Sequence, residues 1–406
     1  MAGAGGAAGD AGNAGAGGNG GDMGNAGAGG NSGTGGGGGT MGMAGAGGMG
    51  GTGMAGAGGM GGMTGAGGMG GTQVVNPPSL TKCTEYDHIV GMCTEGGTGD
   101  WAVWSVAFSP DGKYLLTAAQ DSRVKVWKMN GTVPVADGHE IATNGQAYIA
   151  FSPDGKRLAV GSKLGQFTIH DTATWAVVST PQGLTGHIEG VGFSPDSTKV
   201  FAADTDKHLT MHTVGSDMPL KNVTLPDAAY TLAVSPAQTM GAIVGVGYLS
   251  GFADVLNLAS PTVTPTKALT ISSDAGTSLA YATFSCTFSP DGKTFVAGSE
   301  DGLTSFFALP LGASPKPVGT VIKTTDSLAN PLAVNGMMFA PDGRNIAMSV
   351  GTDFNGGRTG IWDASTHGAK GAKVPTYYPV SVAFSPDGKI VAAGEVACGK
   401  VLICAD

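Results

Sequence analysis

The stretch Phe108-Ser109-Pro110-Asp111-Gly112 decides the fold, because six similar copies of it follow along the sequence. The copies begin at Phe151, Phe193, Val234, Phe288, Phe339 and Phe384, and the seven prolines are 43, 42, 41, 54, 51 and 45 residues apart. In the complete copies, Pro presets φ for a tight turn, Asp suits the next position, and Gly adopts the left-handed conformation that closes a hairpin. A period of about 40 to 45 residues with such turns predicts a β-propeller of four-stranded blades.

Strand-like segments flank each turn. In the first repeat, residues 104–108 alternate in polarity before the turn, and apolar runs at 114–118 and 124–127 follow it. This pattern predicts three strands of a meander, and a weaker segment such as 133–135 predicts a fourth, outer strand. Seven repeats therefore predict an all-β fold with seven four-stranded antiparallel blades.

The composition divides the chain at about residue 76. Residues 1–72 hold 37 of the 74 glycines and no Lys, Arg or aromatic residue. Such a stretch cannot bury enough apolar surface to offset its chain entropy. We therefore expect a disordered low-complexity tether over residues 1–76 and a propeller domain over residues 77–406.

The charge pattern argues against nucleic acid as a partner and against a membrane span. The net charge is −9 and Lys and Arg are scattered, whereas nucleic-acid binding needs a basic surface. No run of 18 consecutive apolar residues occurs, so no transmembrane segment is predicted. The first residues also lack the basic and apolar parts of a secretory signal.

The repeats resemble the blades of tryptophan–aspartate (WD-repeat) propellers across residues 84–406. In that family the third strand often ends in Trp-Asp, and an Asp stands in the turn six residues before the Trp. The residues that match in whole or in part are Asp121 with Trp127, Asp301 with Phe307, and Trp362 with Asp363. The resemblance implies that these six residues have structural roles within their blades.

The family also buries a hydrogen-bond network that joins the His of a Gly-His pair to a Ser or Thr, the turn Asp and the Trp. Gly186-His187 is the clearer Gly-His pair here and Gly138-His139 the weaker one, while Gly356 stands where a turn Asp is expected. The resemblance therefore implies a network that is incomplete in most blades. The chain is identified as a divergent member of bacterial type.

The resemblance also implies how the ring closes. The seventh repeat reaches only its third strand, and in WD-repeat propellers the start of the domain supplies the missing outer strand. Residues 84–92 are the candidate. Because the two strands should be antiparallel, we predict disulfides that join Cys83 with Cys404 and Cys93 with Cys398.

Two alternatives to these disulfides stay open. One is a local Cys83–Cys93 disulfide, and the other is a set of free thiols. Either disulfide arrangement implies an oxidising compartment. The tether also resembles those that follow the lipidated cysteine of bacterial surface lipoproteins, which implies a cell-envelope location and a lipid anchor upstream of this sequence. The alternative is a linker in a cytoplasmic protein.

No catalytic or cofactor motif is found. The sequence lacks a nucleophile elbow, a His-Glu-x-x-His pair, a phosphate loop and a nucleotide fingerprint. His208 and His212 share a strand face, but the repeat places His212 at the position of the blade Trp. The methionines of the tether could hold Cu(I), although low-complexity drift also accounts for them. We predict no metal site, no cofactor and no enzymatic activity.

Recognition usually lies in variable loops on a rigid scaffold. The Ser-Pro-Asp-Gly turns occupy one face, so the opposite face should carry the loops between blades and between the second and third strands, with an insertion near 260–278. The predicted binding residues in these loops are Trp101, Phe354, Asn355 and Arg358. The sequence thus predicts a monomeric, non-catalytic propeller that binds or scaffolds proteins. The alternative is a propeller hydrolase, lactonase or small-ligand binder that uses the central channel.

Overall fold

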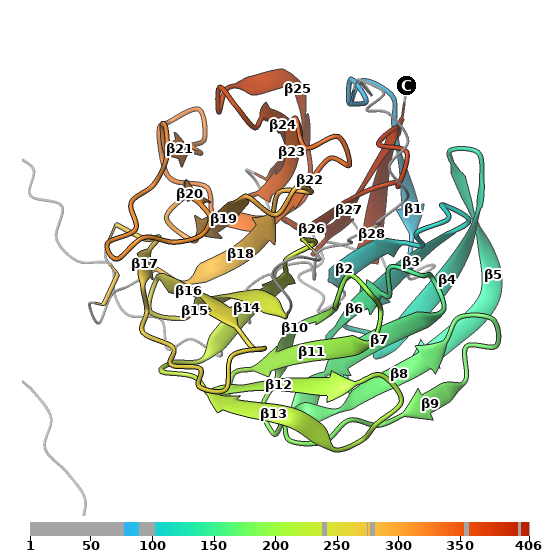
Figure 1. Ribbon diagram of the computed structural model, residues 1–406. Coiled ribbons are helices and arrows are strands. Elements are labelled where there is room, and N and C mark those ends of the chain that lie inside the picture. The colour runs from blue at the N-terminus through green and yellow to red at the C-terminus, as the bar shows by residue number, and fades with distance from the viewer. Residues whose placement is uncertain are drawn as a thin grey trace, which may run out of the picture. The chain divides into compact units, whose positions relative to one another are not determined.

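The computed structural model describes residues 77–88, 102–237, 242–273, 275–276, 281–352, 357–396 and 399–405. In these ranges the chain forms seven antiparallel sheets of four strands each, arranged around a common axis (Figure 1). A short 3-10 turn, η1 (Lys163–Gly165), is the one helical element in the described ranges. The prediction of an all-β, seven-bladed propeller is confirmed. The tether expected over residues 1–76 lies outside the described residues.

Each of the first six blades uses four consecutive strands, and the first of the four lies nearest the axis. Blade 1 contains β2 (Val103–Phe108), β3 (Tyr114–Ala119), β4 (Arg123–Asn130) and β5 (Val133–Ala142). Blade 2 contains β6 (Ala147–Phe151), β7 (Arg157–Ser162), β8 (Phe167–Asp171) and β9 (Val177–Ser179). Blade 3 contains β10 (Ile188–Phe193), β11 (Lys199–Asp204), β12 (His208–Thr213) and β13 (Pro219–Thr224).

The later blades follow the same order. Blade 4 contains β14 (Ala229–Val234), β15 (Ile243–Tyr248), β16 (Phe252–Asn257) and β17 (Leu269–Thr270). Blade 5 contains β18 (Thr283–Phe288), β19 (Thr294–Ser299), β20 (Leu303–Ala308) and β21 (Ile322–Lys323). Blade 6 contains β22 (Val334–Phe339), β23 (Asn345–Val350), β24 (Arg358–Asp363) and β25 (Ala369–Pro375). Blade 7 contains β26 (Pro379–Phe384), β27 (Ile390–Glu395), β28 (Lys400–Ala405) and, outermost, β1 (Cys83–Asp87).

The side chains of the Ser-Pro-Asp-Gly turn hold the turn together. The Ser109 hydroxyl donates to Asp111 Oδ1 at 2.7 Å and accepts from the Tyr114 backbone N–H at 2.9 Å. Gly112 has φ +70°, a conformation that costs a residue with a Cβ about 1–2 kcal/mol. The serines that repeat the contact with the turn Asp are Ser152, Ser194, Ser289 and Ser385. Contacts within each hairpin therefore stabilise these turns without a contribution from neighbouring blades.

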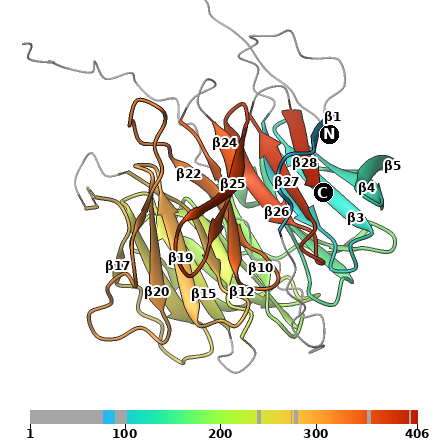
Figure 2. The ribbon, with the colours of Figure 1, turned by 90° about the horizontal axis from the view of Figure 1, so that it is seen from above.

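The core lies between neighbouring blades. The first strand of each blade packs against the first strands of both neighbours, and β2 packs against β26 as well as β6, which closes the ring. Figure 2 shows the blades edge-on, standing side by side. Their close approach requires glycine at some contacts. A Cβ on Gly190 would lie 2.7 Å from the Leu232 backbone nitrogen, and one on Gly394 would lie 2.4 Å from the Val103 carbonyl oxygen.

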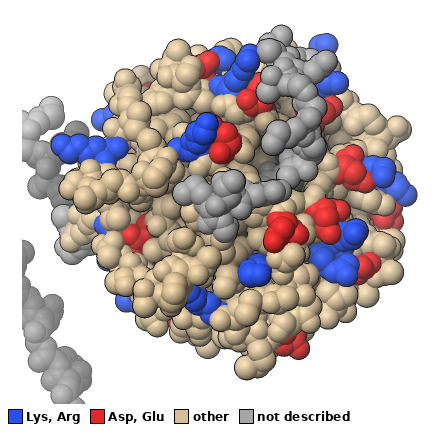
Figure 3. Space-filling view, viewed as in Figure 1, with Lys and Arg blue, Asp and Glu red and all other residues tan. Residues whose placement is uncertain are grey.

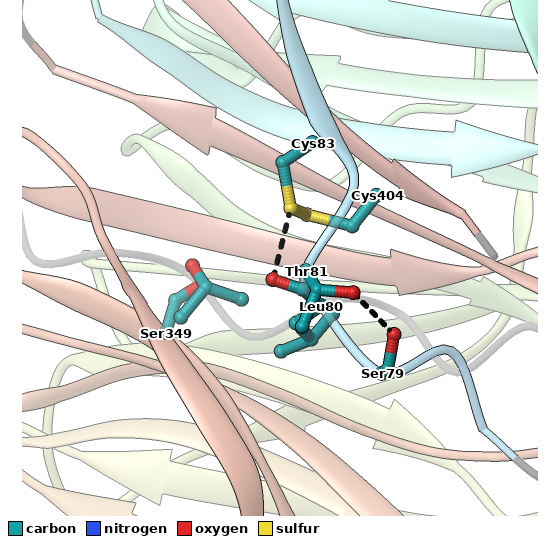
Figure 4. The surroundings of a disulfide bond; sticks show 7 residues. Ser79, Leu80, Thr81, Cys83, Ser349 and Cys404 are labelled. Carbon is teal, nitrogen blue, oxygen red and sulfur yellow. Dashed lines mark hydrogen bonds between the residues drawn. A yellow bond between two sulfur atoms is a disulfide. The ribbon is translucent and has the colours of Figure 1, made fainter.

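The last blade joins the two ends of the propeller domain. β1 pairs antiparallel with β28, and Cys83 lies opposite Cys404 in this register. The two Sγ atoms are 2.03 Å apart, as in a disulfide, and Figure 4 shows the pair near Leu80, which is buried in the core of the last blade. Residues 89–92 of the expected closing segment lie outside the described residues. So do Cys93 and Cys398, and their disulfide stays a prediction.

The outer strands vary most between blades. β5 has ten residues, whereas β17 and β21 have two each. The placement of the whole 260–278 insertion on the face opposite the Ser-Pro turns is wrong. β17 interrupts this segment, so residues 258–268 join the third and fourth strands of blade 4 at the end of the blade where the Ser-Pro turns lie. The part that follows β17 leads to the opposite face.

Candidate functional site: the loop face and the bulge ring

The strand order places two kinds of connection at one end of the blades. Because successive strands are antiparallel, the loops between second and third strands and the loops between blades lie opposite the Ser-Pro turns. We call this side the loop face. Its exposed large apolar residues are Leu164, Leu249, Tyr281, Leu328 and Tyr377. Five of the twelve exposed large apolar residues in the described part of the chain thus lie on this face, and exposed apolar side chains on a rigid scaffold favour an interaction surface.

Two of these leucines stand out. Leu164 in η1 is 78% exposed and Leu328, between blades 5 and 6, is 81% exposed. Leu164 also has φ +58°, a left-handed conformation that a leucine adopts only at a cost of about 1–2 kcal/mol. Backbone conformations of this kind cluster at binding sites, where the surroundings hold them in place.

Of the four predicted binding residues, the structure describes Arg358. Trp101, Phe354 and Asn355 lie outside the described residues. Arg358 begins β24 at the loop face, is half-buried, and its guanidinium donates to the Thr325 carbonyl in the loop before blade 6. That contact ties one blade to the preceding loop, so part of the hydrogen-bonding capacity of Arg358 is used within the fold.

A second feature lies at the axis. In six of the seven blades, the pairing between the first and second strands skips one residue of the first strand. The skipped residue stands four positions before the last residue of that strand. A bulge of this kind leaves the skipped residue unpaired and re-aims its side chain. The skipped residues are Trp104, Glu189, Tyr230, Phe284, Asn335 and Val380, which we call the bulge ring.

Members of the bulge ring contact neighbouring blades. Tyr230 stacks on Phe284 of the next blade, with ring centroids 6.1 Å apart and an interplanar angle of 21°. The Asn335 amide donates to the Pro379 carbonyl at 3.0 Å and so joins blades 6 and 7. Blade 2 pairs without a bulge, and Tyr148 takes this place beside Glu189. Residues more than 40 positions apart in the sequence therefore meet around the axis.

Glu189 is the unusual member of the bulge ring. It is 1% exposed, and neither carboxylate oxygen has a hydrogen bond of normal geometry within the described part of the chain. Burial raises the pKa of Glu189 to about 8, while the nearby Tyr148 hydroxyl and the more distant charge of Lys163 lower it by less. His187 Nδ1 lies 3.9 Å from the carboxylate. A buried carboxyl group with so few partners is a strong candidate for a binding role.

A second carboxyl group lies on the same side of the molecule. Glu300 follows β19, accepts a hydrogen bond from the Ala282 backbone N–H at 3.3 Å, and has its pKa raised by burial. The charges of Glu189 and Glu300, together with burial, raise the pKa of the Tyr230 hydroxyl that they both influence. Blades 3 to 5 thus combine two acids with aromatic rings, whereas blades 6 and 7 contribute Asn335 and Val380 to the bulge ring.

The predicted structural residues Asp121 and Trp127 form part of a network in blade 1. Trp127 Nε1–H donates to Thr117 Oγ1 at 2.8 Å, and Thr117 Oγ1 lies 2.6 Å from His88 Nδ1. His88 Nε2 faces Asp121 at 3.4 Å. Burial lowers the pKa of His88, and the hydrogen bond and charge of Asp121 oppose that shift. His88, which follows β1 of blade 7, thus joins Thr117, Asp121 and Trp127 of blade 1, and all four members of the network that the family buries are present.

His88 is the member that sequence reasoning missed. It follows Asp87 rather than Gly, and it stands 29 residues before Thr117, so the Gly-His pattern did not select it. Assigning a Gly-His role to Gly138-His139 is wrong, because both residues lie in β5 and the His139 ring is 57% exposed. The spacing from the Thr and the Trp would have been a better signal than the preceding residue.

The other predicted structural residues use different partners. Asp301 is buried and accepts from the Ser273 backbone N–H at 2.8 Å, and Phe307, 1% exposed, packs where Trp127 packs in blade 1. Trp362 is buried in blade 6, and the Lys373 ammonium lies 5.5 Å from the centroid of its ring. In the next turn, Asp363 accepts hydrogen bonds from Lys370, Ser365 and Thr366, and these hold its pKa well below the usual range.

Blade 3 replaces the network with an aspartate at a different position. Buried Asp204 accepts from the backbone N–H groups of Thr185, Gly186 and His208. His208 Nδ1 also lies 3.0 Å from this carboxylate, and His212 is buried in the core. Asp204 stands eight residues before His212, whereas the turn Asp of the family stands six residues before the Trp position that His212 occupies. In the described ranges no three His, Cys, Asp or Glu side chains are grouped so as to hold a metal ion.

Charges are mixed on the visible face. Figure 3 shows Lys and Arg interspersed with Asp and Glu over that face. Among the described residues, no helix is long and apolar enough to cross a membrane.

Two segments match the WD domain, G-beta repeat. They are residues 92–128, which include β2, β3 and most of β4 of blade 1, and residues 279–307, which include most of the first three strands of blade 5. These are the two blades in which the spacing of Asp and aromatic residue is best preserved. The resemblance to WD-repeat blades is thus supported at the level of single repeats.

Several WD-repeat and regulatory proteins of eukaryotes are similar to parts of the chain. Meiotic recombination protein rec14 of Schizosaccharomyces pombe is 31% identical over 113 residues, 27% of this chain and 36% of its own length. WD repeat-containing protein SL1-17 of Schistosoma mansoni is 30% identical over 133 residues, 32% of this chain and 42% of its own length. Serine-threonine kinase receptor-associated protein of Mus musculus is 24% identical over 286 residues, 59% of this chain and 79% of its own length. The chain thus spans less than half the length of the first two relatives.

Proposed function

We propose that this protein is a non-catalytic binding module that holds a protein partner on its loop face. The observation that carries the proposal is the set of exposed apolar side chains on that face, led by Leu164 and Leu328. A seven-bladed ring fixes their relative positions, and rigid presentation lowers the entropy cost of binding. The similarity to WD-repeat proteins supports the same role, because WD-repeat propellers typically mediate protein interactions.

The test compares the two faces of the full-length protein. Leu164→Ser together with Leu328→Ser removes the apolar pair of the loop face. The matched control, Met218→Ser together with Val318→Ser, removes two exposed apolar residues near the Ser-Pro turns, where Met218 is 72% exposed. A partner captured from the source cells and then purified should bind the loop-face variant at least 10-fold more weakly and the control unchanged. Equal affinity for both variants would rule out the loop face.

We also propose that the protein works outside the cytoplasm, tethered at a bacterial cell envelope. The support is the pairing of Cys83 with Cys404, because a disulfide between domain ends persists only in an oxidising compartment. The relatives named above are eukaryotic, and none of their names refers to an envelope. The test is alkylation of free thiols in intact cells before lysis, followed by mass spectrometry of the peptides that contain Cys83 and Cys404. If the peptides containing Cys83 and Cys404 carry the alkyl label, the location is not oxidising.

A further inference from the structure

We propose that the partner inserts a cationic side chain, an arginine or a lysine, against Glu189 between Tyr148 and Tyr230. This inference rests on the proposed function and names the chemistry that the loop face recognises. It predicts that the partner carries a basic residue with apolar neighbours. The basic residue contacts the acidic part of the bulge ring, and its neighbours contact the exposed leucines.

The carboxylate of Glu189 lacks the partners that such a buried group normally has. Burial of a carboxyl group without hydrogen bonds costs several kcal/mol, so proteins pair such groups or use them. The Tyr148 hydroxyl accepts a hydrogen bond from the Gln146 side chain at 2.6 Å and acts on Glu189 as a donor, but it lowers the pKa of Glu189 by less than burial raises it. A guanidinium or ammonium group would supply the missing donors and the opposite charge.

Basic groups in the described part of the chain do not fill this role. His187 lies 3.9 Å from the Glu189 carboxylate, but burial and the charge of Lys163 lower the pKa of His187, so its ring is neutral at pH 7. Lys163 influences Glu189 only through its charge and makes no described ion pair with it. Lys267 pairs with Asp227 at 3.2 Å and is therefore used elsewhere. Within the described residues, no charged basic group therefore pairs with the Glu189 carboxyl group.

Aromatic rings flank the carboxylate. Tyr230 is half-buried and stacks on Phe284, so both rings are held in place. Cations bind to aromatic faces with about 0.5–2 kcal/mol, more where water is excluded. Acid and aromatic groups around one point favour a cation over an anion or a neutral group. Because Glu189 is buried, we expect entry to involve rotation of the Tyr230 side chain, an adjustment that is common on binding.

The protonation of Glu189 makes cation binding at this site dependent on pH. With a folded-state pKa of about 8, the carboxyl group is largely protonated at pH 7 and must lose its proton to pair with a cation. The titratable groups that surround it are Tyr148, Lys163, His187, Tyr230 and Glu300. Burial raises the pKa of Glu300, whereas the lowered pKa of His187 keeps its ring neutral at pH 7. Binding of a cation should therefore release up to one proton and strengthen from pH 6.5 to pH 8.5.

The test uses the full-length protein and two small probes, N-acetyl-arginine methylamide and its neutral citrulline analogue. Calorimetry in buffers of different ionisation enthalpy should show proton release with the arginine probe. The arginine probe should bind at least 10-fold more tightly than the citrulline probe. Glu189→Gln should remove this preference, whereas the matched control Glu140→Gln, on the outer strand β5, should keep it.

The outcomes separate this inference from the proposed function. If purified partner binds E189Q as tightly as wild type but loses affinity for the Leu164 and Leu328 variant, the loop face stands and the cation site is overturned. Equal binding of the two probes also overturns it. If E189Q fails to fold, the pH dependence of wild-type protein is measured instead. An affinity for the arginine probe that rises from pH 6.5 to pH 8.5 supports the cation site, and an affinity that does not rise overturns it.

Discussion

Removal of the Cys83–Cys404 link should weaken the ring more than any other change between the first and last strands. The link closes a sequence separation of 321 residues, which is nearly the whole propeller. In the chain-entropy relation a loop of this length restricts the unfolded state by roughly 5–6 kcal/mol at 25 °C. For a fold of about 330 residues, that corresponds to a fall in Tm of roughly 8 °C.

The structure predicts where the weakened ring opens. β1 is held to blade 7 by its pairing with β28, by the ion pair of Lys400 with Glu85, and by the packing of Leu80 and Tyr86. An ion pair at the surface adds little, about 1 kcal/mol or less. Without the disulfide, backbone amides of β1 and β28 should exchange hydrogen faster than those of inner strands, because a local opening there exposes the least apolar surface.

The assay is urea unfolding of wild type and of the Cys83→Ser, Cys404→Ser double variant, each with and without reductant. Reductant should lower the unfolding free energy of wild type to that of the reduced variant. A further loss when the variant is reduced would indicate a second disulfide, as expected for Cys93 with Cys398. Cys286 serves as an internal reference, because burial raises the pKa of its thiol to about 12 and protects it from alkylation in the folded state. A difference below about 1 kcal/mol between wild type and variant would refute the reasoning.

Three further predictions concern the blades themselves. Thr117→Val should lower the unfolding free energy by about 2–4 kcal/mol in the same urea experiment, because two buried partners lose a hydrogen bond. The control is Thr210→Val, which should change the unfolding free energy by less than about 1 kcal/mol, because the buried Thr210 hydroxyl has no partner in the described ranges. Folding raises the pKa of Glu189 from its unfolded value near 4.5 to about 8, so folding takes up a proton and this group's contribution to stability falls as pH rises between those values. From pH 5 to pH 8, the unfolding free energy of Glu189→Gln should therefore rise relative to that of wild type by about 1.4 kcal/mol per pH unit, up to a few kcal/mol in total. A difference that does not depend on pH would contradict this. Gly161→Ala places a Cβ 2.4 Å from a side chain of β10 and should cost about 1–3 kcal/mol in thermal unfolding, whereas Gly312→Ala, with no atom within 4 Å, should cost little.

The part of the fold that sequence reasoning predicts is the part that local chemistry decides. The Ser109–Asp111 contact, the left-handed Gly112 and the strands beside them depend on residues within one hairpin, so their repetition reveals both the blade and the number of blades. The pairing of Cys83 with Cys404 was predicted from the resemblance to WD-repeat propellers, which places an antiparallel strand beside the last one, and the register of β1 and β28 agrees with it.

The candidate site was harder to predict, because its residues share no local motif. Glu189 and Tyr230 look like ordinary strand residues in the sequence, and only their four-residue spacing from the turn relates them. His88 was missed because its partners, Thr117 and Trp127, lie in the next blade along the chain. Arg358 looked free in its loop, but the loop before its blade supplies a carbonyl oxygen to its guanidinium.

The sequence by itself determined the repeating unit and the seven blades, because turn chemistry and strand alternation act over a few residues, whereas the resemblance to WD-repeat propellers predicted the closing strand. The tertiary structure alone decided which side chains meet across blades. Ring closure brings one bulged residue from almost every blade to the axis and buries Glu189 among aromatic rings. Those contacts join residues more than 40 positions apart, and their energies depend on desolvation and on the packing of neighbouring sheets, which no short stretch of sequence encodes.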